Sequence, residues 1–196
     1  MDISRREFLR RSAAAAGSIS LPGLLSGFPL GAKMATRPFG ATGFNASIYT
    51  VGTAEIAANK ESVIALQALF AGGVNMIDTA PSYMATMSES TVGVAIKGQR
   101  EKLWVSTKTL QRSAAGAYWE INESLGRLSC AHVDLLQIHA VNDFATLDEV
   151  LRKGGAIEGI ERAVKEGLVR HVGISGHTRP EVIMRAIEKY PFASIL

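Results

Sequence analysis

Residues 74–78 read VNMID and residues 133–139 read VDLLQIH, two apolar runs that each end on a polar side chain. Helical spacing of apolar residues fills the intervening segments, as over 118–128. Similar runs predict further strands over 48–52, 103–108, 169–175 and 193–196. Strands that alternate with helices in this way predict a parallel α/β sheet or barrel.

Residues typical of helix starts and ends support the same alternation of strands and helices. Gly72-Gly73, Gly98 and Gly167 fall where helices are expected to end. Thr146 with Glu149, and Thr178 with Glu181, match the capping-box pattern at helix starts. Ahead of the first strand, residues 36–39 and 44–47 flank a Gly-containing turn and predict a small hairpin.

The residues that close the expected strands are polar or small, and they recur at intervals of about one βα unit. In order they are Gly52-Thr53, Asp78, Lys108, His139 and Ser175. In a (β/α) barrel such residues project at the carboxyl-terminal face, where barrel enzymes build their sites. An open doubly wound sheet is the alternative, but no G-x-G-x-x-G follows the first strand, which weakens a Rossmann interpretation.

Asp78, Tyr83, Lys108 and His139 together could perform acid catalysis. A free tyrosine has a pKa of about 10 and is a poor acid at neutral pH. A neighbouring ammonium favours the phenolate, and a carboxylate keeps that ammonium charged and in place. A histidine can then align a carbonyl oxygen. Such a set protonates an oxygen while hydride arrives at the carbon.

Each of these residues also has an ordinary structural explanation. Asp78 could cap a helix, Tyr83 could be a half-buried loop aromatic, and Lys108 could be a solvated strand end. His139 could be a core histidine bonded to the backbone. For any one residue the structural explanation is favoured, whereas four such groups at consecutive strand ends favour catalysis.

The surrounding motifs resemble those of the aldo/keto reductase family. The matching stretches are RPFGATG at 37–43, VNMIDTAPSY at 74–83, Ser88-Glu89 with Val92-Gly93, STK at 106–108, SLGRL at 124–128, VDLLQIH at 133–139 and VRHVGIS at 169–175. Two positions depart from the family pattern. Gly176 replaces a common asparagine, and residues 84–87 lengthen the loop after Tyr83.

The resemblance implies an NADPH-dependent reductase of aldehydes or ketones on a (β/α)8 TIM barrel. It implies that Tyr83 donates the proton, that Lys108 and Asp78 support its ionisation, and that His139 orients the carbonyl. It further implies that Gly52, Thr53, Asp78 and Ser175 contact NADP near the nicotinamide. A non-catalytic cofactor-binding or partner subunit on the same scaffold is the alternative function.

The family barrel has eight βα units, and this sequence ends within the sixth expected strand. We therefore expect residues 34–196 to form an incomplete barrel domain. We also expect the isolated chain to be an inactive or very weak fragment.

Residues 1–33 resemble a twin-arginine export signal, with SRREFL at 4–9 followed by an apolar stretch. We therefore expect the twin-arginine export machinery as a partner and a periplasmic or exported location. A basic amphipathic arm, or a true start at Met34, would also explain the segment. Pro22, Pro29 and several glycines interrupt the stretch too often for a stable membrane span.

Charge and metal-binding patterns exclude other classes. The formal net charge is +3, and residues 1–33 alone hold five basic and two acidic side chains. Residues 34–196 are thus near neutral and carry no electrostatic signature for nucleic acid. The histidines lack the spacing of zinc ligands, so no metal site is expected. Cys130 is the single cysteine and cannot form an internal disulfide.

Overall fold

The structure is a computed structural model, and it describes residues 34–196. The expected export signal at 1–33 lies outside the described residues. Within 34–196, six parallel strands pair in sequence order into one sheet. These strands are β3 (Val51–Gly52), β4 (Met76–Asp78), β5 (Trp104–Thr109), β6 (Val133–Ile138), β7 (Val169–Ile174) and β8 (Ser194–Ile195).

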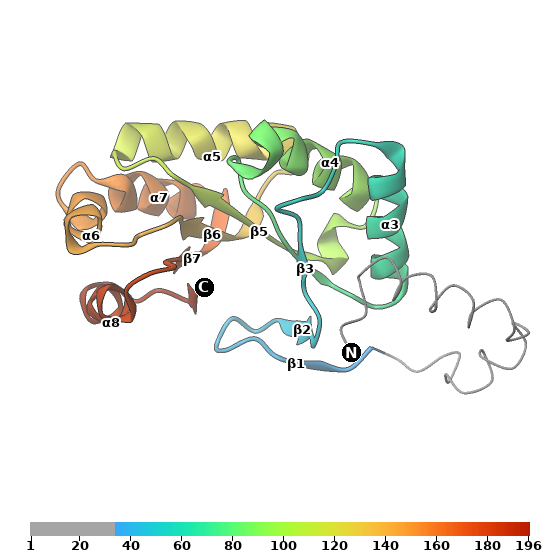
Figure 1. Ribbon diagram of the computed structural model, residues 1–196, viewed down its shortest axis with the longest axis horizontal. Helices are drawn as coiled ribbons and strands as arrows, with labels where there is room; N and C mark the ends of the chain where they lie inside the picture. Colours follow the sequence, from blue (N-terminus) through green and yellow to red (C-terminus); the bar gives the residue numbers. More distant parts are fainter. Residues whose placement is uncertain (1–33) are drawn as a thin grey trace, which may run out of the picture. The chain divides into compact units, whose positions relative to one another are not determined.

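Helices follow the strands in the order that the sequence predicts. They are α3 (Lys60–Ala71), α4 (Met87–Ile96), α5 (Ala114–Leu128), α6 (Phe144–Leu151), α7 (Ala156–Lys165) and α8 (Pro180–Lys189), with short 3₁₀ turns η1 (Tyr83–Thr86) and η2 (Arg100–Lys102). Figure 1 shows α4, α5 and α7 side by side along one face of the sheet. The parallel α/β prediction is confirmed, and the six strands form part of a barrel.

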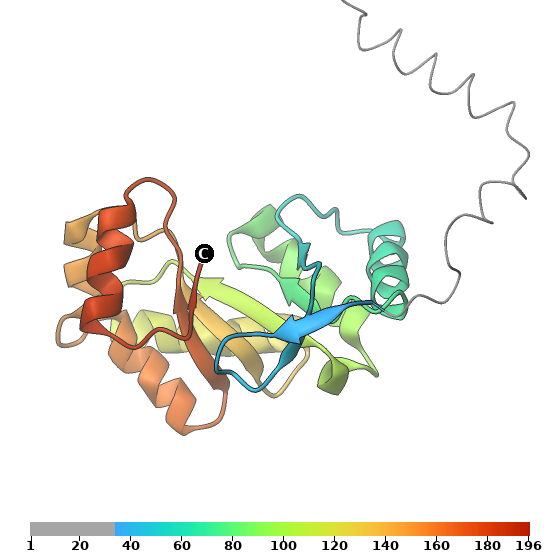
Figure 2. The same ribbon diagram turned by 90° about the horizontal axis from the view of Figure 1, so that it is seen from below.

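A hairpin of β1 (Thr36–Pro38) and β2 (Asn45–Ser47) precedes the sheet, as predicted. Figures 1 and 2 show it on the side of the sheet opposite α5. The rings of Phe39 and Phe44 pack against Trp104, with centroids 5.3 and 5.2 Å from it. Trp104 begins β5, so the hairpin covers the amino-terminal side of the sheet and leaves the carboxyl-terminal side to the polar strand ends.

The core lies between the sheet and its helices. Ile77, Val105 and Ile138 from the strands are fully buried, as are Leu128 from α5 and Ile160 from α7. Apolar side chains on helix faces at 3.6-residue spacing and on strands thus meet in one layer, and burying them is the main favourable term in folding.

Two local predictions were wrong. The first strand covers only Val51–Gly52, because Ser47 donates to the Tyr49 carbonyl and turns Ile48 and Tyr49 outward. The capping boxes also fail. Asp143 caps α6 by accepting from the Thr146 amide. Helix α8 has Arg179 at its N-cap, with no side-chain cap, while the Thr178 hydroxyl donates to the Asn142 carbonyl.

Candidate active site

The carboxyl-terminal ends of β4, β5 and β6 bring four polar side chains together. Asp78 is the last residue of β4, Lys108 lies near the end of β5, and His139 directly follows β6. Tyr83 begins η1, in the loop after β4. Because parallel strands in register end at one edge of a sheet, residues that are 61 positions apart in the sequence, Asp78 and His139, meet at one site.

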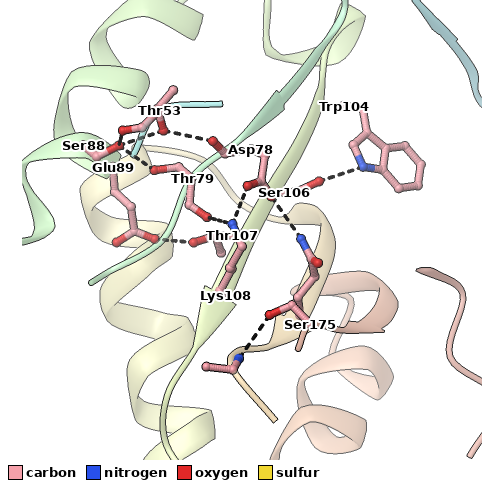
Figure 3. Close-up of polar contacts among 12 residues, drawn as sticks. Thr53, Asp78, Thr79, Ser88, Glu89, Trp104, Ser106, Thr107, Lys108 and Ser175 are labelled. Atoms are coloured by element: carbon pink, nitrogen blue, oxygen red, sulfur yellow. Dashed lines mark hydrogen bonds and ion pairs between the residues drawn. The ribbon is translucent and has the colours of Figure 1, made fainter. Parts of the chain in front are cut away.

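Lys108 is the centre of this cluster. Its side chain is 1% exposed, and its ammonium donates hydrogen bonds to the Asp78 carboxylate and to the Thr79 carbonyl, the latter at 2.9 Å (Figure 3). A buried ammonium is costly unless it is paired and hydrogen-bonded, and both partners come from the end of β4. The ion pair therefore fixes the charge of Lys108 at the carboxyl edge of the sheet.

The Asp78 carboxylate receives a second donor. Gln137 of β6 donates from Nε2 to Oδ1 at 3.0 Å, while Lys108 faces Oδ2. Burial raises the pKa of Asp78 above its ordinary value, and the charge of Lys108 and the two hydrogen bonds oppose that rise. The two donors thus act together to favour the charged form of a partly buried carboxylate.

Tyr83 lies against Lys108 through its ring. The Lys108 nitrogen is 4.7 Å from the ring centroid, a cation–π contact. The hydrogen bonds described for the ammonium go to Asp78 and Thr79, so the contact is with the ring face and not with the hydroxyl. The Tyr83 ring also meets the His139 ring edge-on at 6.0 Å. The phenol, the ammonium and the imidazole are therefore neighbours.

The loop that holds Tyr83 has an unusual backbone. Met84, Ala85 and Thr86 have φ values of 48°, 49° and 72°, in the left-handed region that side chains other than glycine rarely adopt. This is the segment that the sequence marked as longer than the family pattern. Three successive left-handed residues turn the chain sharply between Tyr83 and α4.

His139 is held neutral at its position. Burial, and next the positive charge of Lys108, lower its pKa to about 4. Arg112 donates from Nη2 to the His139 carbonyl at 2.8 Å and fixes the backbone there. Among the described residues, the buried Nδ1 of His139 has no hydrogen-bond partner. A neutral imidazole carries one N–H and can donate a single hydrogen bond to a substrate oxygen.

A cavity of about 240 Å³ adjoins this imidazole. Its lining combines loop residues with polar side chains, namely Pro81, Ser82, Thr86, Leu110, Gln111, Glu120 and His139. The volume suits a small molecule, and it lies at the same edge of the sheet as the four-residue cluster. Within residues 34–196, no group of three or more His, Cys, Asp or Glu side chains is arranged to hold a metal ion.

The residues expected to contact NADP differ in how accessible they are to a ligand. Gly52 lies at the end of β3, and a Cβ added there would have nothing within 4 Å, so its backbone is open to a ligand. The Thr53 hydroxyl is buried, and it donates to the Asp78 carbonyl at 2.9 Å. The buried Ser175 hydroxyl accepts from the Ala140 amide at 3.1 Å. Gly52 is paired in register with Asp78, so this open strand end lies beside the end of β4.

Two further polar residues contact this site, Gln137 and Arg112, and the sequence assigned a role to neither. Gln137 was quoted only as part of VDLLQIH, although it lies two residues before His139 and so shares its side of the strand. Arg112 follows β5 by three residues and carried no motif signal at all. Its contact with the His139 carbonyl depends on tertiary structure.

No helix within the described range 34–196 has the length and hydrophobicity needed to span a membrane.

Comparisons with known proteins agree with this geometry. The Aldo/keto reductase family profile matches residues 48–195. L-galactose dehydrogenase of Arabidopsis thaliana is 30% identical over 159 residues, covering 74% of this chain and 49% of the relative. An uncharacterized oxidoreductase of Bacillus subtilis, YqkF, is 29% identical, covering 83% and 55%. The chain thus spans about half the length of the curated relatives it matches.

Solved structures give the same result. The holo form of aldo-keto reductase AKR11C1 from Bacillus halodurans superposes with a TM-score of 0.74 at 27% identity, covering 83% of this chain and 56% of that one. An aldo/keto reductase from Klebsiella pneumoniae, solved in complex with NADP and acetate, gives 0.65 at 25% identity, covering 80% and 54%. With its profile match over most of its length, this chain belongs to the aldo/keto reductase family.

Proposed function

We propose that this chain carries the catalytic residues of an NADPH-dependent reductase of small aldehydes or ketones. The observation that carries the proposal is the buried Lys108 ammonium, which is paired with Asp78 and also lies over the Tyr83 ring. A buried ion pair adds little to stability by itself, so its place beside a phenol at the carboxyl edge of the sheet favours a chemical role.

The proposed reaction assigns one task to each side chain. NADPH, when bound, supplies a hydride to the carbonyl carbon of the substrate. The Tyr83 hydroxyl gives its proton to the carbonyl oxygen, so that an alcohol and NADP⁺ result. Lys108 offsets the negative charge that develops on the phenol oxygen, and Asp78 holds Lys108 in place. The neutral His139 donates a hydrogen bond that orients the carbonyl.

Gly52, Thr53, Asp78 and Ser175 would hold the nicotinamide end of NADP. The open backbone of Gly52 would let the ring approach the strand end. The Thr53 and Ser175 hydroxyls would act by fixing the neighbouring backbone, since both already bond to carbonyl or amide groups of the chain. An aldo/keto reductase of similar fold was solved with NADP, which supports this cofactor.

The test compares two tyrosine variants in the full-length chain taken together with the remaining βα units of the barrel, because residues 1–196 alone are expected to be inactive or very weak. NADPH oxidation is followed with methylglyoxal and benzaldehyde as probes, and NADPH binding by nicotinamide fluorescence. Tyr83→Phe is expected to lower turnover by ~10²–10⁴-fold while NADPH still binds. Tyr118→Phe is the matched control, because it removes the hydroxyl of a half-buried tyrosine that donates to Glu166 on the outer helices, away from the site.

Each outcome decides between the candidate functions. Equal turnover by wild type and Tyr83→Phe would refute the role of Tyr83 as proton donor. NADPH binding without oxidation of any probe would favour the non-catalytic cofactor-binding subunit. A chain that neither binds nor oxidises NADPH would contradict the proposal altogether.

We also propose that residues 1–33 direct export by the twin-arginine route to the periplasm. The motif SRREFL and the apolar stretch behind it support this. The full chain is expected in the periplasmic fraction of a host with that pathway. Replacing Arg5 and Arg6 by lysine is expected to retain it inside, and unchanged export of that variant would refute the proposal.

A further inference from the structure

Gln137 makes a contact inside the sheet that the four proposed catalytic residues do not explain. It lies in β6 and pairs in register with Lys108 of β5. Its side chain is 2% exposed and reaches past Lys108 to donate from Nε2 to Asp78 Oδ1 at 3.0 Å. One amide therefore connects the third strand of the site to the carboxylate of the first.

The orientation of this amide is decided by its partner. An ionised carboxylate only accepts hydrogen bonds, so the NH₂ group of Gln137 faces Asp78 and the carbonyl oxygen faces elsewhere. Among the described residues that buried oxygen, Oε1, has no hydrogen-bond partner. Leaving a buried acceptor unpaired is costly. The residue is thus poorly suited to packing alone, and an aliphatic side chain would fill the space without this cost.

The two donors on Asp78 act at different oxygens. Lys108 faces Oδ2 and Gln137 faces Oδ1. A carboxylate held at one oxygen can rotate about its last bond, because that torsion has a broad energy profile. Held at both oxygens, it has a single orientation. The second donor therefore fixes the direction in which Asp78 presents its charge to Lys108.

We propose that Gln137 is a positioning residue that orients the Asp78 carboxylate toward Lys108 and thereby holds the ammonium against the Tyr83 ring. The proposal rests on the proposed reductase function for its consequence in catalysis. Its structural part, the control of Asp78 by Gln137, stands independently of turnover. Asp78 and Gln137 both line a cavity of about 330 Å³ on the inner side of the sheet, together with Gly52 and Ser106.

The test is the titration of Asp78 in the full-length chain labelled with ¹³C at aspartate carboxyl carbons, with Asp78→Asn to assign its resonance. Gln137→Met keeps the volume of the side chain and removes the hydrogen bond. We expect it to raise the titration midpoint of Asp78 by about one pH unit, since a hydrogen bond to the charged form is lost. An unchanged midpoint would overturn the proposal.

Gln99→Met is the matched control. Gln99 also donates one side-chain hydrogen bond, to the Ala95 carbonyl at 3.2 Å, but it lies between α4 and η2, ahead of β5 and away from the site. It is expected to leave the Asp78 midpoint and the turnover unchanged. A shift of similar size in Gln99→Met would show that the change in Gln137→Met is not local, and would contradict the proposal.

The wild-type chain provides a second measurement in case Gln137→Met does not fold. The side-chain amide resonances of Gln137 in ¹⁵N-labelled protein are expected to shift with pH at the same midpoint as the Asp78 carboxyl carbon. Asp78→Asn is expected to abolish that shift. Gln137 amide resonances that do not respond to the Asp78 titration would refute the contact.

Kinetics separate this proposal from the proposed function. If Gln137 positions the ion pair for catalysis, Gln137→Met is expected to lower kcat about tenfold, as a shift of one pH unit implies, with the Kd for NADPH unchanged. A moved midpoint with normal kcat would limit Gln137 to a structural role and overturn the positioning claim. A wild-type chain without turnover would count against the reductase function, while the two titrations still decide the control of Asp78.

Discussion

The ammonium of Lys108 lies 4.7 Å from the centroid of the Tyr83 ring, and its hydrogen bonds go to Asp78 and Thr79. The positive charge thus contacts both a carboxylate and a phenol ring, at the carboxyl-terminal edge of the neighbouring strands β4 and β5. This relationship couples stability to the proposed chemistry, because removing Lys108 changes the surroundings of both of its neighbours.

Replacing Lys108 by methionine is expected to lower turnover at least as much as Tyr83→Phe does, by ~10²–10⁴-fold. The variant removes the charge beside the phenol and leaves the partly buried Asp78 carboxylate without its ion partner. Steady-state NADPH oxidation measures the effect, and urea unfolding checks that the variant folds. Lys97→Met, at an exposed position after α4, is the control. A folded Lys108→Met chain with wild-type turnover would refute the proposed role.

His139 predicts a pH dependence of stability. Its pKa is about 4 in the folded chain and about 6.5 in an unfolded one. Between these values the unfolded chain binds a proton that the folded chain does not, so folding stability falls as the pH is lowered through this window. The slope from this group is at most ~1.4 kcal/mol per pH unit.

His139→Gln is expected to remove that contribution. Urea unfolding of wild type and variant at a series of pH values measures it, and the difference between their unfolding free energies should change between pH ~6.5 and ~4. His132 and His171, whose pKa values are also lowered by burial, contribute equally to both chains and cancel in the difference. Parallel curves across the window would show that His139 titrates normally.

The sequence predicted the sheet well because its signals are local. Val133–Ile138 and Val169–Ile174 are apolar runs of strand length, and each is followed by the polar residue that the pattern required. The positions of Asp78, Lys108 and His139 followed from the same rule, because strands in parallel register must end together.

What the sequence could not predict depends on contacts between distant segments. The cap of α6 went to Asp143 and not to Thr146, since both residue types favour that position and only the backbone geometry decides. The left-handed turn after Tyr83 contains no glycine, the residue that usually predicts such a backbone conformation. The hydrogen bond from the Gln137 amide to Asp78 joins β6 to β4, two strands that are distant in the sequence, so no local pattern predicts it.

Removing one partner of the buried ion pair of Glu89 and Arg127 is expected to destabilise the fold strongly, although the intact pair adds little stability by itself. Glu89 of α4 is 0% exposed, and it accepts from Arg127 of α5 at 2.6 Å and from Thr107 of β5 at 2.5 Å (Figure 3 shows the latter). Arg127→Met would leave a buried carboxylate without its charge partner, at ~3–5 kcal/mol of unfolding free energy. Urea unfolding measures this loss.

Arg185→Met is the matched control for that variant. Arg185 pairs with Glu188 on the surface of α8, with both side chains more than half exposed. Exposed pairs contribute ~0–1 kcal/mol, so this variant is expected to unfold nearly as the wild type does. If the two arginine variants lose similar stability, the Glu89 carboxylate is not held in a buried pair.

Any side chain larger than that of glycine at position 93 is expected to destabilise the fold for a steric reason. Gly93 lies on α4 where the helix crosses α5, and a Cβ added there would come within 2.6 Å of the Arg127 carbonyl oxygen and 2.9 Å of the Leu128 carbonyl carbon. Both are backbone atoms that cannot move without shifting a helix. Gly93→Ala is therefore expected to cost ~1–3 kcal/mol of unfolding free energy, as overpacking does.

Gly126, in the neighbouring helix α5, is expected to tolerate a side chain where Gly93 does not. A Cβ at Gly126 of α5 would have nothing within 4 Å, so Gly126→Ala gains helix propensity without a clash. It is expected to raise the unfolding free energy by up to ~1 kcal/mol. The two alanine variants should therefore shift the urea midpoint in opposite directions, and a shared direction would mean that α4 and α5 do not approach as closely as their backbones show.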